Sequence, residues 1–79
     1  MNKLLGELLG WYGAAAIITA YVLVSFSIMN SSSLAFQLLN LTGAIGILAI
    51  SLAKKVYQTA AINIIWAIVA AAAIVRMML

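Results

Sequence analysis

The chain has 79 residues, of which 68% are hydrophobic and 6% are charged, and it contains no Pro, no Cys and no His. A soluble domain of this length carries about a quarter charged residues, so the composition excludes an ordinary water-soluble domain. A helix that crosses a bilayer needs about 20 residues, so three spans fit and a fourth does not. We therefore expect an all-α integral membrane protein with three transmembrane helices, forming a single membrane domain over residues 1–79.

The first span is expected near residues 8–29. It is followed by the cluster Asn-Ser-Ser-Ser at 30–33, and such residues favour local side-chain to backbone hydrogen bonds over helix. The apolar stretch is longer than the roughly 7 to 15 residues of a secretory leader, so we expect a retained span rather than a leader.

The second and third spans are expected near residues 34–53 and 57–78. Between them lie Lys54 and Lys55, and a charged side chain is costly at the bilayer centre, so this pair marks an interface. The alanine run at 70–73 favours helix by propensity. No alternation of apolar and polar residues suggests the strands of a barrel.

The basic residues predict the orientation of the spans. Three helices place Lys3, Lys54 and Lys55 on one side and only Arg76 on the other. By the positive-inside bias, we expect the N-terminus inside and the C-terminus outside. The net charge of +3 is then a topology signal and an attraction to lipid headgroups, so membrane lipid is an expected partner and nucleic acid is not.

The charged and nucleophilic residues argue against several chemistries. Glu7 is the only carboxylate side chain, and it lies one helical turn after Lys3, where we expect a surface ion pair. Ion-coupled carriers keep a carboxylate well inside a span, which argues against that class and against a rotor-ring subunit. Neither a metal site nor a nucleophile and base pair can be assembled, so we expect no metal, no cofactor and no enzyme.

Small residues mark candidate packing surfaces. Gly6 and Gly10 form a GxxxG pair in the first helix, and Gly43 and Gly46 lie on one side of the second. In hydrocarbon, helices associate through close packing of small residues and through interhelical hydrogen bonds. The two stripes offer more than one association face and predict a homo-oligomer.

Two amides inside the spans are the candidate functional residues. Asn40 and Asn63 lie at depths where water cannot satisfy them, so each needs a partner. Tyr21 and Ser25 fall at about the depth of Asn40, and Trp66 shares a helix face with Asn63. These five residues are the candidate ligand-binding set.

Two interpretations of the amides stay open. In the first, they are interhelical ties worth about 0.6 to 2 kcal/mol each, and Trp66 fills the volume opposite Gly46. In the second, they line a small polar pocket, where the aromatic ring stacks on an uncharged ligand and the amides bind its hydroxyl or carbonyl groups.

The sequence resembles a group of small, uncharacterised bacterial three-span proteins. The resemblance rests on a W-x-G start at residues 11–13, an A-Y pair at 20–21, an L-L-N-x-x-G-A pattern at 38–44 and an N-x-x-W pattern at 63–66. It covers nearly the whole chain and brings no known activity. It implies a multi-pass protein of the bacterial cytoplasmic (inner) membrane.

More distantly, the length, the three spans and the Asn in the third span resemble the SemiSWEET and PQ-loop transporters. In that family, three-helix units pair around a central sugar pocket that includes a Trp and an Asn. The resemblance implies an oligomeric carrier for a small neutral solute, with Asn63 as a pocket amide and Trp66 as a looser counterpart. The family's Pro-Gln motif is missing from residues 25–27, and its orientation would be opposite to the one expected here.

Two other functions remain as alternatives. The chain could be a structural or accessory subunit that binds other membrane proteins. A holin-like hole former is also small and three-spanning, but it usually ends in a charged tail. This chain ends in Arg76-Met77-Met78-Leu79, so we place that reading last.

Overall fold

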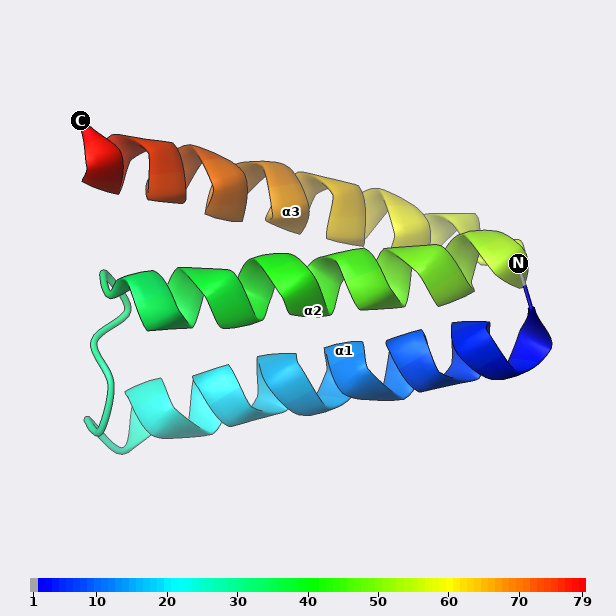
Figure 1. Cartoon of the computed structure of the whole chain (residues 1–79), viewed down its shortest axis with the longest axis horizontal. Helices are drawn as coiled ribbons and strands as arrows, with labels where there is room; N and C mark the ends of the chain where they lie inside the picture. Colours follow the sequence, from blue (N-terminus) through cyan, green and yellow to red (C-terminus); the bar gives the residue numbers. More distant parts are fainter. Residues whose placement is uncertain (1) are drawn as a thin grey trace.

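The computed structural model describes residues 2–79 and consists of three helices, α1 (Lys3–Ser25), α2 (Leu34–Ala53) and α3 (Tyr57–Met78). Each helix is long and apolar enough to cross a membrane, which confirms the expected fold class. The helices run up, down and up, and α2 lies between α1 and α3 (Figure 1). The bounds of α2 and α3 coincide with those expected for the second and third spans.

The first two helices have side-chain caps at their N-termini and the third has none. The Asn2 side chain accepts a hydrogen bond of 2.7 Å from the Leu4 amide at the start of α1. The Ser33 hydroxyl accepts one of 3.2 Å from the Phe36 amide at the start of α2. Such caps satisfy amides that have no partner within the helix. Helix α3 follows Val56 without any side-chain cap.

Helix α1 ends at Ser25, although the apolar stretch continues to residue 29. Ser27 adopts a left-handed conformation with φ of 60°. Its amide donates to the Val24 carbonyl, and the Ile28 amide donates to the Leu23 carbonyl at 2.9 Å. This is the Schellman pattern that closes helix C-termini. Hydropathy reports the depth of a residue and not the direction of the chain, so the expected span ran past the helix end.

The turn between α2 and α3 uses the same pattern. Lys55 has φ of 59°, and the Val56 amide donates to the Ser51 carbonyl at 2.8 Å. Both turns therefore place a residue with a Cβ in a region that normally favours Gly. The lysine pair expected at a membrane interface forms the turn between α2 and α3.

Apart from Asn63, the buried residues among 2–79 are small. The buried hydrophobic side chains in this range are all alanines, and none of its large side chains is fully buried. Such an interior cannot hold a domain together in water, because little apolar area is removed from solvent. In a bilayer, close packing of small residues is what joins helices. The longest dimension, 35 Å, suits a hydrocarbon core of about 30 Å, and the chain is a multi-pass membrane protein.

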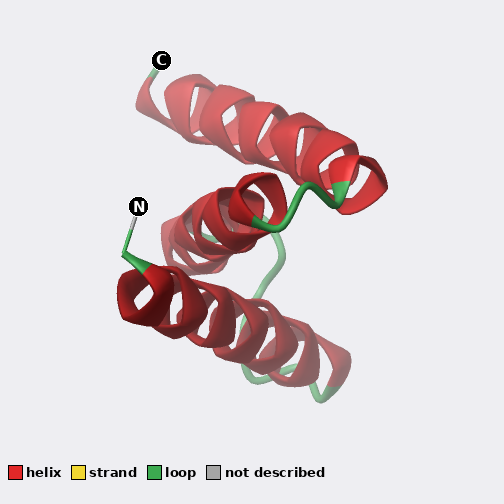
Figure 2. Ribbon diagram, turned by 90° about the vertical axis from the view of Figure 1, so that its right-hand side faces the viewer, coloured by secondary structure: helices red, strands yellow, loops and turns green. Residues whose placement is uncertain are grey.

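The outer helices α1 and α3 do not pack against each other. Helix α2 contacts both, but no Cα atom of α1 lies within 8 Å of a Cα atom of α3. The view in Figure 2 shows the two outer helices separated, with α2 between them. The arrangement leaves a groove that has α2 as its floor and α1 and α3 as its walls.

Candidate functional site

Glycines bring the backbones of α1 and α2 together at one wall of the groove. A Cβ added to Gly13 would collide with the carbonyl oxygen of Gly43, and one added to Gly46 would collide with the carbonyl oxygen of Leu9. A Cβ on Gly43 would lie 3.0 Å from the Gly13 carbonyl oxygen. These contacts involve backbone atoms, which cannot move aside as a side chain can. The α1–α2 approach therefore requires Gly at these positions.

The expected packing glycines lie in this interface, together with one that the sequence analysis missed. Gly6, Gly43 and Gly46 are buried, and a Cβ on Gly10 would lie 2.7 Å from the Ile50 side chain. The missed residue is Gly13, which lies outside the GxxxG pair. The sequence signal that could have identified Gly13 is the seven-residue spacing of small residues on one face of α1, at Gly6, Gly13 and Ala20. All three are buried in the structure.

A hydrogen bond between side chains also joins α1 to α2. The Tyr12 hydroxyl lies 2.7 Å from the Thr42 hydroxyl oxygen. Thr42 directs its single hydrogen to the Leu38 carbonyl at 2.8 Å, so Tyr12 is the donor. The Tyr12 hydroxyl therefore reaches the middle of α2.

The one carboxylate pairs across helices. The Lys54 ammonium lies 2.6 Å from a Glu7 carboxylate oxygen, and this pair joins the start of α1 to the end of α2. We expected Lys3 as the partner. The antiparallel packing of α1 and α2 brings Lys54 close instead, and a contact between helices is invisible to a search along one helix.

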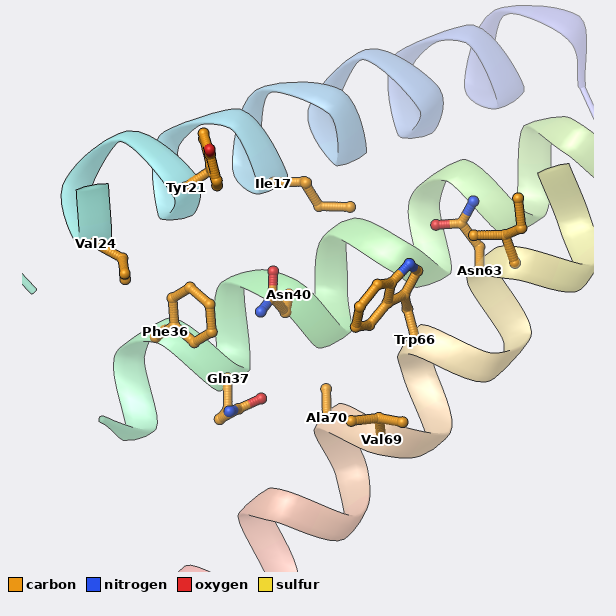
Figure 3. A pocket seen from close by; sticks show the side chains of 11 residues that line it. Ile17, Tyr21, Val24, Phe36, Gln37, Asn40, Asn63, Trp66, Val69 and Ala70 are labelled. Carbon is orange, nitrogen blue, oxygen red and sulfur yellow. The ribbon is translucent and has the colours of Figure 1, made fainter. Parts of the chain in front are cut away.

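A cavity of about 450 Å³ occupies the part of the groove nearer the α1–α2 loop (Figure 3). We call it the amide cavity. Its walls come from all three helices, and its lining has three amides, three aromatic rings and aliphatic side chains. The lining residues are Ile17, Tyr21, Val24, Phe36, Gln37, Asn40, Ile62, Asn63, Trp66, Val69 and Ala70.

Four of the five candidate binding residues meet in this cavity. Tyr21, Asn40, Asn63 and Trp66 line it together, although they come from three helices. Ser25 does not line it and is exposed at the last position of α1. A shared depth therefore did not predict which residues line the cavity.

The amide cavity is also lined by a third amide, and the expected contact between Trp66 and Gly46 does not form. Gln37, one turn before Asn40 on α2, lines the cavity and donates to the Ser31 carbonyl at 3.3 Å. Its position one helical turn from Asn40 was the sequence signal that could have identified it as a lining residue. Trp66 is 58% exposed and faces the cavity, whereas Gly46 contacts Leu9 of α1. The expectation that Trp66 fills the volume opposite Gly46 is therefore wrong.

The hydrogen bonds of the two candidate amides stay within one helix or are absent. Asn63 is 6% exposed, and its side-chain nitrogen donates to the Thr59 carbonyl of α3 at 2.9 Å. The half-buried Asn40 side chain makes no hydrogen bond with the residues that the structure describes, 2–79. Within this part of the chain, neither amide joins two helices.

A second cavity, of about 410 Å³, lies in the same groove at the end that carries the lysines. We call it the lysine cavity. Ala14 in this cavity and Tyr21 in the amide cavity are seven residues apart on α1, as are Asn40, Ile47 and Lys54 along α2. Seven residues are about two helical turns, so the two cavities follow one face. The lining is Glu7, Gly10, Trp11, Ala14, Ile47, Ile50, Ser51, Lys54, Val56 and Thr59.

The helices and the groove define a small three-helix, multi-pass membrane protein whose polar span residues gather in one cavity. A model of an uncharacterised protein family matches residues 6–79, and the chain belongs to this family. No curated protein and no solved structure matches the chain.

Proposed function

We propose that the protein is a non-enzymatic, homo-oligomeric carrier of the bacterial inner membrane, and that the amide cavity binds a small neutral polar solute. The observation that carries the proposal is the hydrogen bonding of the two span amides. They line the same cavity, and neither bonds to another helix within residues 2–79. Amides that served only as ties between helices would bond across a helix interface.

The unused hydrogen-bonding capacity faces the cavity. A carboxamide has two N–H donors and an acceptor oxygen. Asn63 uses one donor on the Thr59 carbonyl, and Asn40 uses none of its groups on residues 2–79. In hydrocarbon, an unsatisfied polar group costs several kcal/mol. Hydroxyl or carbonyl groups of a bound solute would remove this cost, which favours a polar ligand.

The rest of the lining favours an uncharged ligand with an apolar face. None of the eleven lining residues carries a charge. Tyr21 and Trp66 offer flat rings on opposite walls of the groove, and both are largely exposed. The cavity volume of about 450 Å³ lies within the usual range of ligand sites, about 300 to 1,000 Å³. A sugar or a metabolite of similar size would fit this chemistry.

A second copy of the chain would complete the site. The walls α1 and α3 do not meet, so the amide cavity opens to the side between them. An open cavity would expose the amides to lipid chains, and a facing copy would cover both grooves. The resemblance to SemiSWEET transporters, in which three-helix units pair around a pocket, supports the same assembly. Crosslinking in mild detergent would test it, and a stable monomer at every lipid ratio would contradict it.

The lysine end of the bundle is proposed to face the cytoplasm. The N-terminal end of α1 and the α2–α3 turn lie at the same end of the molecule, opposite the C-terminus (Figure 1). Lys3, Lys54 and Lys55 therefore share one side, and Arg76 lies on the other. Reporter fusions at each terminus test this orientation, and a cytoplasmic C-terminus would contradict it.

The test of transport is a proteoliposome uptake screen with sugars and other neutral metabolites. Asn63→Leu and Trp66→Ala should abolish flux while oligomer size and helix content stay unchanged. Ser25→Ala and Tyr57→Ala are matched controls outside both cavities and should keep the flux. The proposal fails if no solute moves, or if the controls lose flux as fully as the cavity variants.

A second candidate, an accessory subunit that binds another membrane protein, is supported by the aliphatic part of the same lining. Ile17, Val24, Ile62 and Val69 would suit a transmembrane helix of a partner in the groove. In that case no flux exists, and Asn63→Leu should weaken co-purification of the partner by about 1 kcal/mol. The uptake screen and the co-purification therefore separate the two functions.

A further inference from the structure

We infer that the lysine cavity binds the phosphate group of an anionic phospholipid. This site lies in a different part of the groove from the proposed solute site, and it does not depend on transport. Four features of the described residues point to it: an uncapped helix N-terminus, a hydroxyl that opens into the cavity without a partner in residues 2–79, an ammonium group and an interfacial Trp.

The N-terminus of α3 offers free backbone donors beside the cavity. Asn2 and Ser33 cap the other two helices, but no side chain caps α3. The first amides of a helix have no partner within it, and together with the helix dipole they attract anions. Val56 and Thr59, from the start of α3, line the lysine cavity. The free donors thus lie at the edge of a space that can hold a headgroup.

The hydroxyl is that of Ser51 on α2. This residue is 5% exposed and lines the lysine cavity. Its hydroxyl makes no hydrogen bond with residues 2–79. Thr42 on the same helix, by contrast, donates to a carbonyl of its own helix. A hydroxyl of a nearly buried residue that opens into the cavity beside free helix amides suits an oxygen-rich, anionic group.

The charge at this end suits an anion in spite of Glu7. Lys54 has three N–H donors and uses its contact with Glu7 at 2.6 Å for one direction, so further donors remain for the cavity. Lys3 and Lys55 lie at the same end of the molecule, so lysines outnumber the single carboxylate there. Each Lys near an anionic surface contributes favourably to lipid binding.

A lipid is a better source of this phosphate than a free ion, because the cavity continues into apolar surface. Ala14, Ile47 and Ile50 line it on the side toward the bilayer centre. Trp11 is 73% exposed and lines it as well, and Trp rings prefer the headgroup level of a membrane. A phosphodiester at the lysine end with an acyl chain along the groove matches both halves of the lining.

The test uses Trp11 as the only Trp. In the Trp66→Phe background, the full chain is reconstituted into phosphatidylcholine vesicles that contain either brominated phosphatidylglycerol or brominated phosphatidylcholine, which quench a Trp in contact with them. We expect stronger quenching by the phosphatidylglycerol at equal mole fraction. Lys54→Gln should reduce this preference by about fivefold. Ser51→Ala should reduce it in part, without changing any charge.

The matched control is Lys3→Gln, which removes the same charge at the same end but outside the lining, and should keep the preference. Equal quenching by the two lipids would overturn the inference, as would an equal effect of Lys3→Gln and Lys54→Gln. If Lys54→Gln does not fold, an unchanged preference in Ser51→Ala would overturn it alone. Loss of the preference in excess inorganic phosphate would assign the site to the free anion instead of a lipid.

Discussion

The two helix interfaces of this protein are built differently. Between α1 and α2, backbones meet at Gly13, Gly43 and Gly46, and side chains join across the interface by a hydrogen bond and an ion pair. Between α2 and α3, Ala60 and Ala70 are buried, and no hydrogen bond or ion pair between side chains joins the two helices within residues 2–79. The first interface is specified by backbone contact and polar bonds, and the second by small side chains together with the buried Asn63, whose amide bonds within α3.

This difference suggests where movement is easiest. Backbone contacts and hydrogen bonds across an interface resist a change in helix spacing, whereas alanine surfaces can slide over each other. Helix α3 carries Asn63 and Trp66, so one wall of the amide cavity belongs to the less constrained helix. The proposed carrier function would need one wall of the site to move against another. We therefore expect α1 and α2 to act as a unit and α3 to supply the motion.

The largest expected effect comes from breaking the backbone contact of α1 and α2. Gly13→Ala should lower the free energy of unfolding by about 3 kcal/mol, because its Cβ would meet the Gly43 carbonyl. Gly10→Ala is the matched control, since its Cβ meets only the Ile50 side chain, and should cost about 1 kcal/mol. Equilibrium unfolding in mixed micelles measures both. Equal losses would contradict the account of this interface.

The hydrogen bond between α1 and α2 gives the next effect. Tyr12→Phe and Thr42→Val should each cost about 1 kcal/mol, and the double variant little more than either, because both remove one bond. Asn63→Leu, which loses only a bond within α3, should cost less than about 0.6 kcal/mol. A double-mutant cycle in the same micelles measures the coupling. Additive losses would show that the bond does not form.

A smaller effect is expected at the ion pair. Glu7→Gln should lower the free energy of unfolding by less than about 1 kcal/mol, because the Lys54 side chain is 56% exposed and that of Glu7 is 37% exposed. The loss should shrink at high salt, which screens exposed pairs. Lys3→Gln, which removes a charge without breaking this pair, should leave stability unchanged. An equal loss of unfolding free energy in Lys3→Gln would indicate that Glu7 pairs with Lys3.

The smallest effect should come from the turn after α1. Ser27→Gly should raise the free energy of unfolding by about 0.5 kcal/mol, since Gly adopts the left-handed conformation without a Cβ penalty, offset in part by its freer unfolded chain. Ser25→Gly, two residues earlier and helical, should instead lower it by up to about 1 kcal/mol. Thermal unfolding of both variants checks the sign. A destabilising Ser27→Gly would rule out the proposed turn strain.

The residues of the amide cavity show how far reasoning along the chain can reach. Asn40, Asn63 and Trp66 were predicted as binding residues because polar and amphipathic groups are costly or rare inside a span. This cost does not depend on the neighbouring helices. Ser25 was grouped with them by depth, and depth alone does not fix a face. Gln37 was not among the expected residues, although it lies one turn from Asn40 and lines the same cavity.

The sequence by itself determined the number of helices, the bounds of α2 and α3 and the membrane setting, because the thickness of hydrocarbon and the cost of charge act on each segment separately. Only the tertiary structure decided that α2 lies between the others, that Gly13 meets Gly43, and that Glu7 pairs with Lys54. These are contacts between faces of different helices. Which faces meet depends on how closely two backbones can approach, and that is a property of pairs of surfaces rather than of any one stretch of chain.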